Sequence, residues 1–113
     1  MRDTSLKPQR IALSTCGSAE DAARLAQELV SRRLAACVNI VPGVRSFYWW
    51  ENSVQDDSEF LLVIKTRVEA LPQLQAALQE LHSYDVPEFV VLPIVDGAPA
   101  YLSWIDANVS QTG

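Results

Sequence analysis

The fold is decided by residues 36–66, whose sequence is ACVNIVPGVRSFYWWENSVQDDSEFLLVIKT. Residues 36–50 are rich in β-branched and aromatic side chains, and Pro42-Gly43 is their only break, which predicts one bent strand. Residues 59–66 are apolar on both alternating faces, as is typical of a central strand covered on both sides. We therefore expect a long hairpin with a polar turn at residues 51–57.

This hairpin is too long for the domain that carries it. Fifteen residues from 36 to 50 would span on the order of 50 Å if straight, whereas a globule of this size has a radius of gyration of about 13 Å. The far end of the hairpin should therefore project into solvent, and it contains Phe47, Tyr48, Trp49 and Trp50. Large exposed apolar patches usually mark an interface, so the hairpin predicts a partner.

The other segments alternate between strand-like and helix-like patterns. We expect a strand at 11–15, a helix that Ser18 caps and that ends near 34, the hairpin and a helix at 69–81. A strand at 88–95, which Pro93 confines to a sheet edge or a bulge, and a helix at 99–109 should follow. This order predicts an α+β, ferredoxin-like βαββαβ sandwich with an extra C-terminal helix. We expect residues 10–110 to form one domain and residues 1–9 to be a disordered tail.

Composition and charge exclude some classes of partner and indicate the cellular compartment. The chain has 113 residues, is 49% hydrophobic and has a net charge of −5. An acidic surface disfavours nucleic acid and anionic membranes, because both need a cationic partner. The N-terminal stretch lacks the apolar segment of a secretory signal, so we expect a cytoplasmic protein with Cys16 and Cys37 as reduced thiols.

Few residues carry recognisable chemistry. The sequence has no Gly-rich phosphate loop, no CxxC pair, no HExxH and no nucleophile elbow, so we expect no enzyme and no catalytic residues. The single histidine, His82, can bind a metal only with ligands brought near by folding, and a structural role is the alternative. Cys16 lies just before a predicted helix, which could lower its pKa and make it a metal ligand. A small buried residue in a turn is an equal alternative for Cys16.

A second candidate site uses one strand. Glu59 and Lys65 point to the same face of the strand at its two ends, and either could be a plain strand-end charge. Lys65 and Thr66 would offer an ammonium and a hydroxyl to a small anion if Tyr84 and Tyr101 closed over them. We therefore consider these five residues as one candidate ligand cleft.

Several separated motifs, in this order, resemble the CutA (CutA1) divalent-ion tolerance family. They are LAACVNI at 34–40, SFYWWE at 46–51, Glu59 with Lys65-Thr66, HSYDVPE at 82–88 and YLSW at 101–104. The resemblance implies a ferredoxin-like subunit in a tight homotrimer like that of the PII signalling proteins. It also implies a cytoplasmic, non-enzymatic protein that binds divalent metal such as Cu²⁺ and takes part in the response to metal ions. No cofactor is expected to be required for folding.

The resemblance also places the exposed aromatics, which would lie against the sheet edges of two neighbouring subunits. Two alternatives remain: a PII-like signalling trimer that binds a small anion at clefts between subunits, and a purely structural assembly module. Three positions depart from the family pattern. Asn52 replaces a glycine at the hairpin turn, and Ser83 replaces a proline, which should loosen the segment around His82. The thiol proposed as a copper ligand in some members aligns with Ser14, so Cys16 is a displaced substitute.

Overall fold

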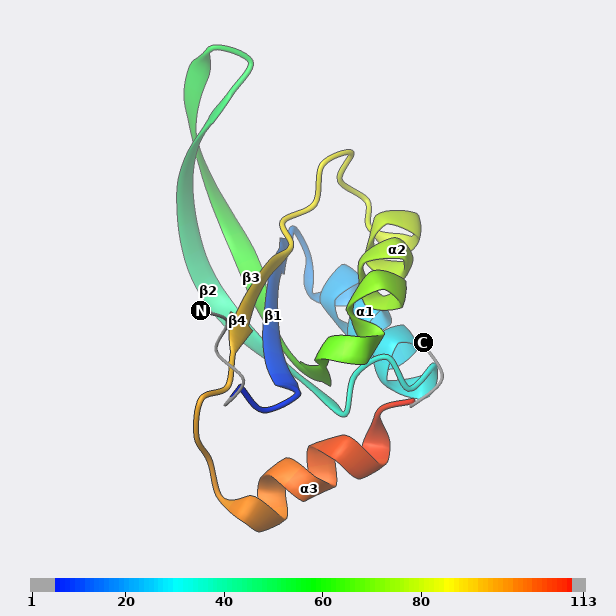
Figure 1. Cartoon of the computed structure of the whole chain (residues 1–113). Helices are drawn as coiled ribbons and strands as arrows, with labels where there is room; N and C mark the ends of the chain where they lie inside the picture. Colours follow the sequence, from blue (N-terminus) through cyan, green and yellow to red (C-terminus); the bar gives the residue numbers. More distant parts are fainter. Residues whose placement is uncertain (1–5, 111–113) are drawn as a thin grey trace.

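The computed structural model describes residues 6–110 and contains one four-stranded antiparallel sheet with three helices (Figure 1). The strand order is β2-β3-β1-β4, which together with the order along the chain confirms the ferredoxin-like α+β fold. The elements are β1 (Gln9–Cys16), α1 (Ala19–Ser31), β2 (Cys37–Trp50), β3 (Ser53–Arg67), the short 3₁₀ helix η1 (Val68–Ala70), α2 (Leu71–Leu81), β4 (Val90–Pro93) and α3 (Pro99–Asn108).

Helices α1 and α2 lie side by side on one face of the sheet and cover it (Figure 1). Ser18 caps α1, as expected, by accepting a hydrogen bond from the backbone N–H of Asp21 at 3.1 Å. The main core fills the space between helices and sheet with fully buried side chains from both layers. They include Leu25, Leu29, Leu62, Ile64, Leu74 and Leu78. Within residues 6–110, no helix is long and apolar enough to cross a membrane.

The N-terminal boundary of the domain differs from expectation. The expected disordered tail at 1–9 is too long by at least one residue, because Gln9 opens β1 and is buried. Its Nε2 donates to Asp106 Oδ1 at 2.8 Å, a contact with α3 that local sequence does not reveal. The rest of that expectation concerns residues 1–5, which lie outside the described residues, and 6–8, which precede the strand. Helix α3 is anchored by a second cluster that includes Leu102 and Ile105.

The hairpin is longer and its turn tighter than expected. The turn is only Glu51-Asn52, and not the expected 51–57, because the ladder between β2 and β3 continues to the pair Trp50–Ser53. Both turn residues have positive φ, 50° for Glu51 and 66° for Asn52, which matches the right-handed twist of a two-residue hairpin. Asn52 keeps the left-handed conformation that a glycine would take, because asparagine tolerates it.

The outer half of this hairpin, residues 44–59, projects beyond the sheet, and we call it the arm (Figure 1). A bulge at Pro42-Gly43 separates the arm from the rest of β2, at the position where the sequence predicted a bend. The radius of gyration is 14.9 Å, above the value of about 13 Å typical of a compact domain of this length. The difference is consistent with the projecting arm.

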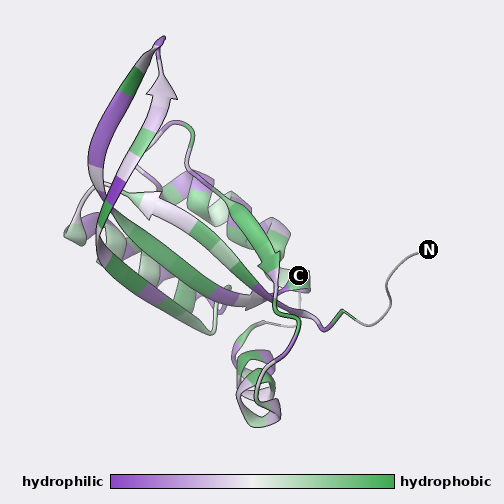
Figure 2. Ribbon diagram, turned by 90° about the vertical axis from the view of Figure 1, so that its left-hand side faces the viewer, coloured by the Kyte–Doolittle hydropathy of each residue, from purple (hydrophilic) through white to green (hydrophobic). Residues whose placement is uncertain are grey.

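The sheet face opposite α1 and α2 is covered among the described residues only at one end, where α3 contacts Gln9 and Lys65, and we call this face the open face. Figure 2 shows this face in front of the helices, with hydrophobic bands along its strands. Strand alternation places Leu13, Val63 and Lys65 on it, and Val90 and Leu92 of β4 extend it at the edge. Strand β4 is shorter than the expected 88–95, and it lies on the edge of the sheet, as expected for a strand that contains Pro93.

The turn geometry gives a stability prediction. Glu51 adopts a left-handed backbone that asparagine tolerates better than glutamate, so Glu51→Asn should raise the free energy of unfolding by about 0.5 kcal/mol. Urea denaturation at equal protein concentration measures the change. The matched control, Glu80→Asn near the end of α2, should give no gain because its backbone is helical. An unchanged or lower stability of Glu51→Asn would contradict this account of the turn.

Candidate functional site

A cleft of about 680 Å³ lies between the arm and the loop that joins α2 to β4. The loop comprises residues 82–88, and we call it the 82–88 loop. It contributes Tyr84, Asp85 and Glu88 to the cleft, while the arm contributes Trp50 and Glu59. The cleft is therefore built from segments far apart in sequence, and the position of the 82–88 loop decides its shape.

His82 fixes the loop to the sheet. Its Nε2 lies 2.7 Å from the carbonyl oxygen of Thr15, and its Nδ1 accepts the backbone N–H of Tyr84 at 3.0 Å. Because Nδ1 accepts, the hydrogen is assigned to Nε2, which donates to Thr15. His82 is only 8% exposed, and both ring nitrogens are occupied. Its structural role is therefore visible, and a metal at His82 would have to replace one of these bonds.

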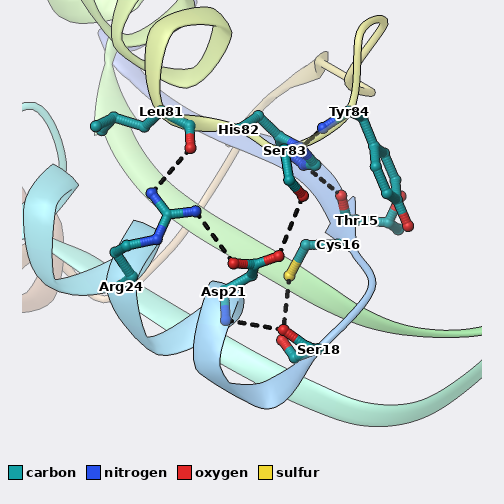
Figure 3. A network of polar contacts seen from close by, with 9 residues as sticks. All are labelled: Thr15, Cys16, Ser18, Asp21, Arg24, Leu81, His82, Ser83 and Tyr84. Atoms are coloured by element: carbon teal, nitrogen blue, oxygen red, sulfur yellow. Dashed lines mark hydrogen bonds and ion pairs between the residues drawn. The ribbon is translucent and has the colours of Figure 1, made fainter.

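A second set of polar contacts ties the same loop to α1 (Figure 3). Arg24 donates from Nη1 to the carbonyl oxygen of Leu81 at 2.9 Å and from Nη2 to Asp21 Oδ1 at 3.2 Å. Ser83 Oγ donates to Asp21 Oδ2 at 3.1 Å. These hydrogen bonds, that from Arg24 first, lower the pKa of Asp21. The Ser83 hydroxyl adds a link to α1 that a proline at this position could not make, and this link acts against the expected loosening of the segment.

Cys16 is a buried core residue. It has no exposed surface, and its Sγ contacts the carbonyl oxygen of Ser18 at 3.8 Å. Burial raises the pKa of this thiol, which is opposite to the lowering expected from the nearby helix N-terminus. Because the folded thiol holds its proton more tightly, this contribution to stability is complete below the ordinary thiol pKa and is lost at higher pH. Cys16 is thus poorly suited to bind a metal within this chain.

The described residues of one chain do not form a metal centre. Across residues 6–110, no group of three or more His, Cys, Asp or Glu side chains could hold an ion. Ser14 is fully buried, and its hydroxyl has no hydrogen-bond partner among residues 6–110. His82 and Cys16 therefore do not make a site by themselves.

The expected five-residue ligand cleft is divided between two places. Glu59 accepts a hydrogen bond from the Tyr84 hydroxyl at 2.7 Å, next to the arm. Lys65 Nζ lies 3.4 Å from the Tyr101 hydroxyl, near α3. Six positions along β3 separate Glu59 from Lys65, on the order of 20 Å. Thr66 belongs to neither place, because it faces the helices, is buried and donates to the carbonyl oxygen of Leu34 at 2.7 Å.

The Tyr84 side chain packs against Gly17, which directly follows β1. A Cβ on Gly17 would lie 3.3 Å from the Tyr84 hydroxyl oxygen, so the glycine leaves room for this ring. Burial, followed by the hydrogen bond to Glu59, raises the pKa of Tyr84. The residue therefore stays a neutral hydrogen-bond donor. Sequence reasoning missed Asp85 and Glu88 as cleft residues, although both belong to the HSYDVPE motif.

The four aromatic side chains of the arm alternate between its two faces. Phe47 and Trp49 are 62% and 73% exposed, and the Arg45 guanidinium stands 5.0 Å from the centre of the Phe47 ring. Tyr48 and Trp50 face the cleft, where the Tyr48 hydroxyl donates to Asp57. All four are exposed in one chain, as their position on the projecting hairpin predicts.

Residues 10–108 match the family model described as CutA1 divalent ion tolerance protein. The chain is 47% identical over 100 residues to the divalent-cation tolerance protein CutA of Thermus thermophilus, covering 88% of this chain and 97% of that protein. It is 48% identical over 105 residues to the chloroplastic protein CutA 1 of Oryza sativa, covering 93% of this chain and 59% of that longer protein.

A solved structure extends the similarity to three dimensions. The crystal structure of CutA1 from Oryza sativa superposes with a TM-score of 0.91 at 43% identity, covering 96% of this chain and 100% of the crystallised chain. The projecting hairpin and the 82–88 loop both lie within residues 10–108, the range that the family model matches.

His82 gives a prediction that separates structure from metal binding. His82→Ala removes partners from Thr15 and Tyr84, so the free energy of unfolding should fall by about 1 to 3 kcal/mol even with EDTA present. Urea denaturation followed by tryptophan fluorescence measures it. The control Ser83→Ala, at an exposed position, should cost less than His82→Ala. Full stability of His82→Ala in EDTA would show that the imidazole is not structural.

Proposed function

The chain belongs to the CutA1 divalent ion tolerance family, and on that premise we propose that it acts in divalent-cation tolerance as a homotrimer. In this proposal the trimer binds a divalent metal such as copper at sites between subunits and takes part in the response to metal ions. It includes no catalytic step, no nucleic acid and no membrane partner, which accords with the net charge of −5. We propose the cytoplasm as its location.

The arm is the observation that carries the proposal of assembly. It exposes Phe47 and Trp49 at the end of a ladder whose outer strand, β2, is an edge of the sheet. The open face adds half-exposed Val90 and Leu92 on the other edge. Burying apolar surface and pairing a free strand edge are both favourable, and three equivalent contacts close into a ring without a remaining edge.

We place the proposed metal site between subunits because residues 6–110 of one chain contain no group of three metal-binding side chains. Both ring nitrogens of His82 already form hydrogen bonds within the chain, to the Thr15 carbonyl and the Tyr84 N–H. In a three-fold assembly, however, a single donor near the axis occurs three times. Thiol and imidazole donors suit copper. A metal site that is completed only between subunits is therefore the form of the proposal that the geometry favours.

A second candidate is a PII-like signalling trimer that senses a small anion. Lys65 supports it, because its ammonium forms no ion pair with any residue of 6–110 and contacts only the Tyr101 hydroxyl and ring. Such a cation on the open face could bind an anion at a subunit boundary. A purely structural assembly module is the third candidate, and it would show neither metal nor anion binding.

We predict that the purified chain is a trimer held together by the arm. Light scattering of the purified chain should give about three times its 12.5 kDa mass at micromolar concentration. Phe47→Ser combined with Trp49→Ser should dissociate or aggregate the assembly, because truncating a central interface aromatic costs about 2 kcal/mol or more. The control Gln73→Ser, on the exposed side of α2, should leave the mass unchanged. A stable monomeric parent would refute the proposed role of the arm.

Metal uptake is predicted to depend on assembly. The chain, purified without chelator or affinity tag and dialysed against Cu²⁺ or Zn²⁺, should retain metal in a fixed ratio to the trimer. The Phe47→Ser, Trp49→Ser variant should lose this metal if it becomes a folded monomer, since residues 6–110 of one chain contain no ligand group. Elemental analysis measures the ratio. Retention by a folded monomer would place the site within one chain, and no retention by the parent would remove metal binding.

A further inference from the structure

The cleft between the arm and the 82–88 loop is strongly acidic. Three of its lining residues are carboxylates, Glu59, Asp85 and Glu88, and none is Lys, Arg or His. Within residues 6–110, none of the three carboxylates forms an ion pair. A concave surface lined by charges of one sign focuses its field, so the cleft attracts cations.

Glu59 gives this cleft a binding group that is more than a surface charge. Its side chain is only 6% exposed, yet it lines the cleft. Its Oε2 accepts the Tyr84 hydroxyl, while Oε1 receives no hydrogen bond from any described residue. Because Oε1 is not among the fully buried side-chain atoms that lack a partner, it keeps contact with solvent in the cleft and can accept a charge-assisted hydrogen bond from a cation.

The remaining walls are aromatic. Phe47, Tyr48, Trp50 and Tyr84 all line the cleft. Aromatic faces attract cations, above all when an ammonium is partly removed from water. The cleft volume of about 680 Å³ falls within the range of small-molecule sites.

The spacing of the carboxylates favours an organic cation over a metal ion. A metal needs several ligands within about 2.5 Å of one point, and the described residues hold no such group of three. The cleft instead distributes its negative charges, with Glu59 on the arm strand β3 and Asp85 and Glu88 on the loop. Separated carboxylates with apolar surface between them suit a chain that carries separate ammonium groups on methylene segments.

We propose that this cleft binds a linear aliphatic diamine or polyamine. One ammonium pairs with Glu59 against the Trp50 and Tyr84 rings, another pairs with the loop carboxylates, and the methylenes lie on Val86 and Pro87. The proposal does not depend on metal binding. Assembly through the arm would use Trp49 and Val54, which are exposed and do not line the cleft, together with Phe47, which borders the cleft.

Calorimetric titration with spermidine, in EDTA and at low salt, tests the proposal on the full chain. The parent should bind in a saturable manner, and the neutral diol 1,4-butanediol should not. Glu59→Gln should weaken binding about tenfold, since loss of one charge-assisted pair costs about 1.4 kcal/mol or more. Glutamine still offers an oxygen to the Tyr84 hydroxyl, so the fold should survive. The matched control Glu80→Gln, an exposed carboxylate on α2, should bind like the parent.

Three outcomes would overturn the proposal. They are no saturable heat with the parent, equal affinity in Glu59→Gln, and an equal loss in Glu80→Gln, which would mean that only net charge matters. If Glu59→Gln does not fold, Asp85→Asn with Glu88→Gln serves instead, because both residues are exposed on the loop. EDTA and a mass measurement on the same sample keep these results separate from the metal and trimer proposals.

Discussion

The hydrogen-bonded ladder between β2 and β3 is the interaction on which the rest of the molecule depends. β3 pairs with β2 on one side and with β1 on the other, so it forms the centre of the sheet that α1 and α2 cover. The same ladder continues beyond the sheet to Trp50 and Ser53. One strand thus carries buried Leu62 and Ile64 in the core and Glu59 at the base of the arm, and the position of the cleft follows from this continuity.

A second constraint is the attachment of the 82–88 loop. Backbone groups at the end of β1 and at the end of α2 are bonded by His82 and Arg24, so the loop is held by groups that are otherwise left free at element ends. This attachment explains why the sole histidine is structural in one chain. It also explains how Tyr84 comes to donate to a carboxylate of the arm, which closes one wall of the cleft.

Membership of the CutA1 family and the geometry of one chain give different information about function. The family supplies the link to divalent-cation tolerance. The single chain supplies an exposed aromatic arm and an acidic cleft, but among its described residues it supplies no metal centre. Both facts agree if metal chemistry belongs to the assembly, while the cleft serves a separate cationic ligand.

The sequence by itself determined the order of elements, the Ser18 cap, the bend at Pro42-Gly43 and the projecting hairpin, because hydrophobic period, capping and turn residues act between near neighbours. Only the tertiary structure decided the chemistry. The Glu51-Asn52 turn depends on cross-strand pairing, the raised pKa of Cys16 on burial, and the separation of Lys65 from Glu59 on the length of β3. Both bonds to the His82 ring and the acidic cleft depend on contacts between distant segments, whose distances a linear pattern does not contain.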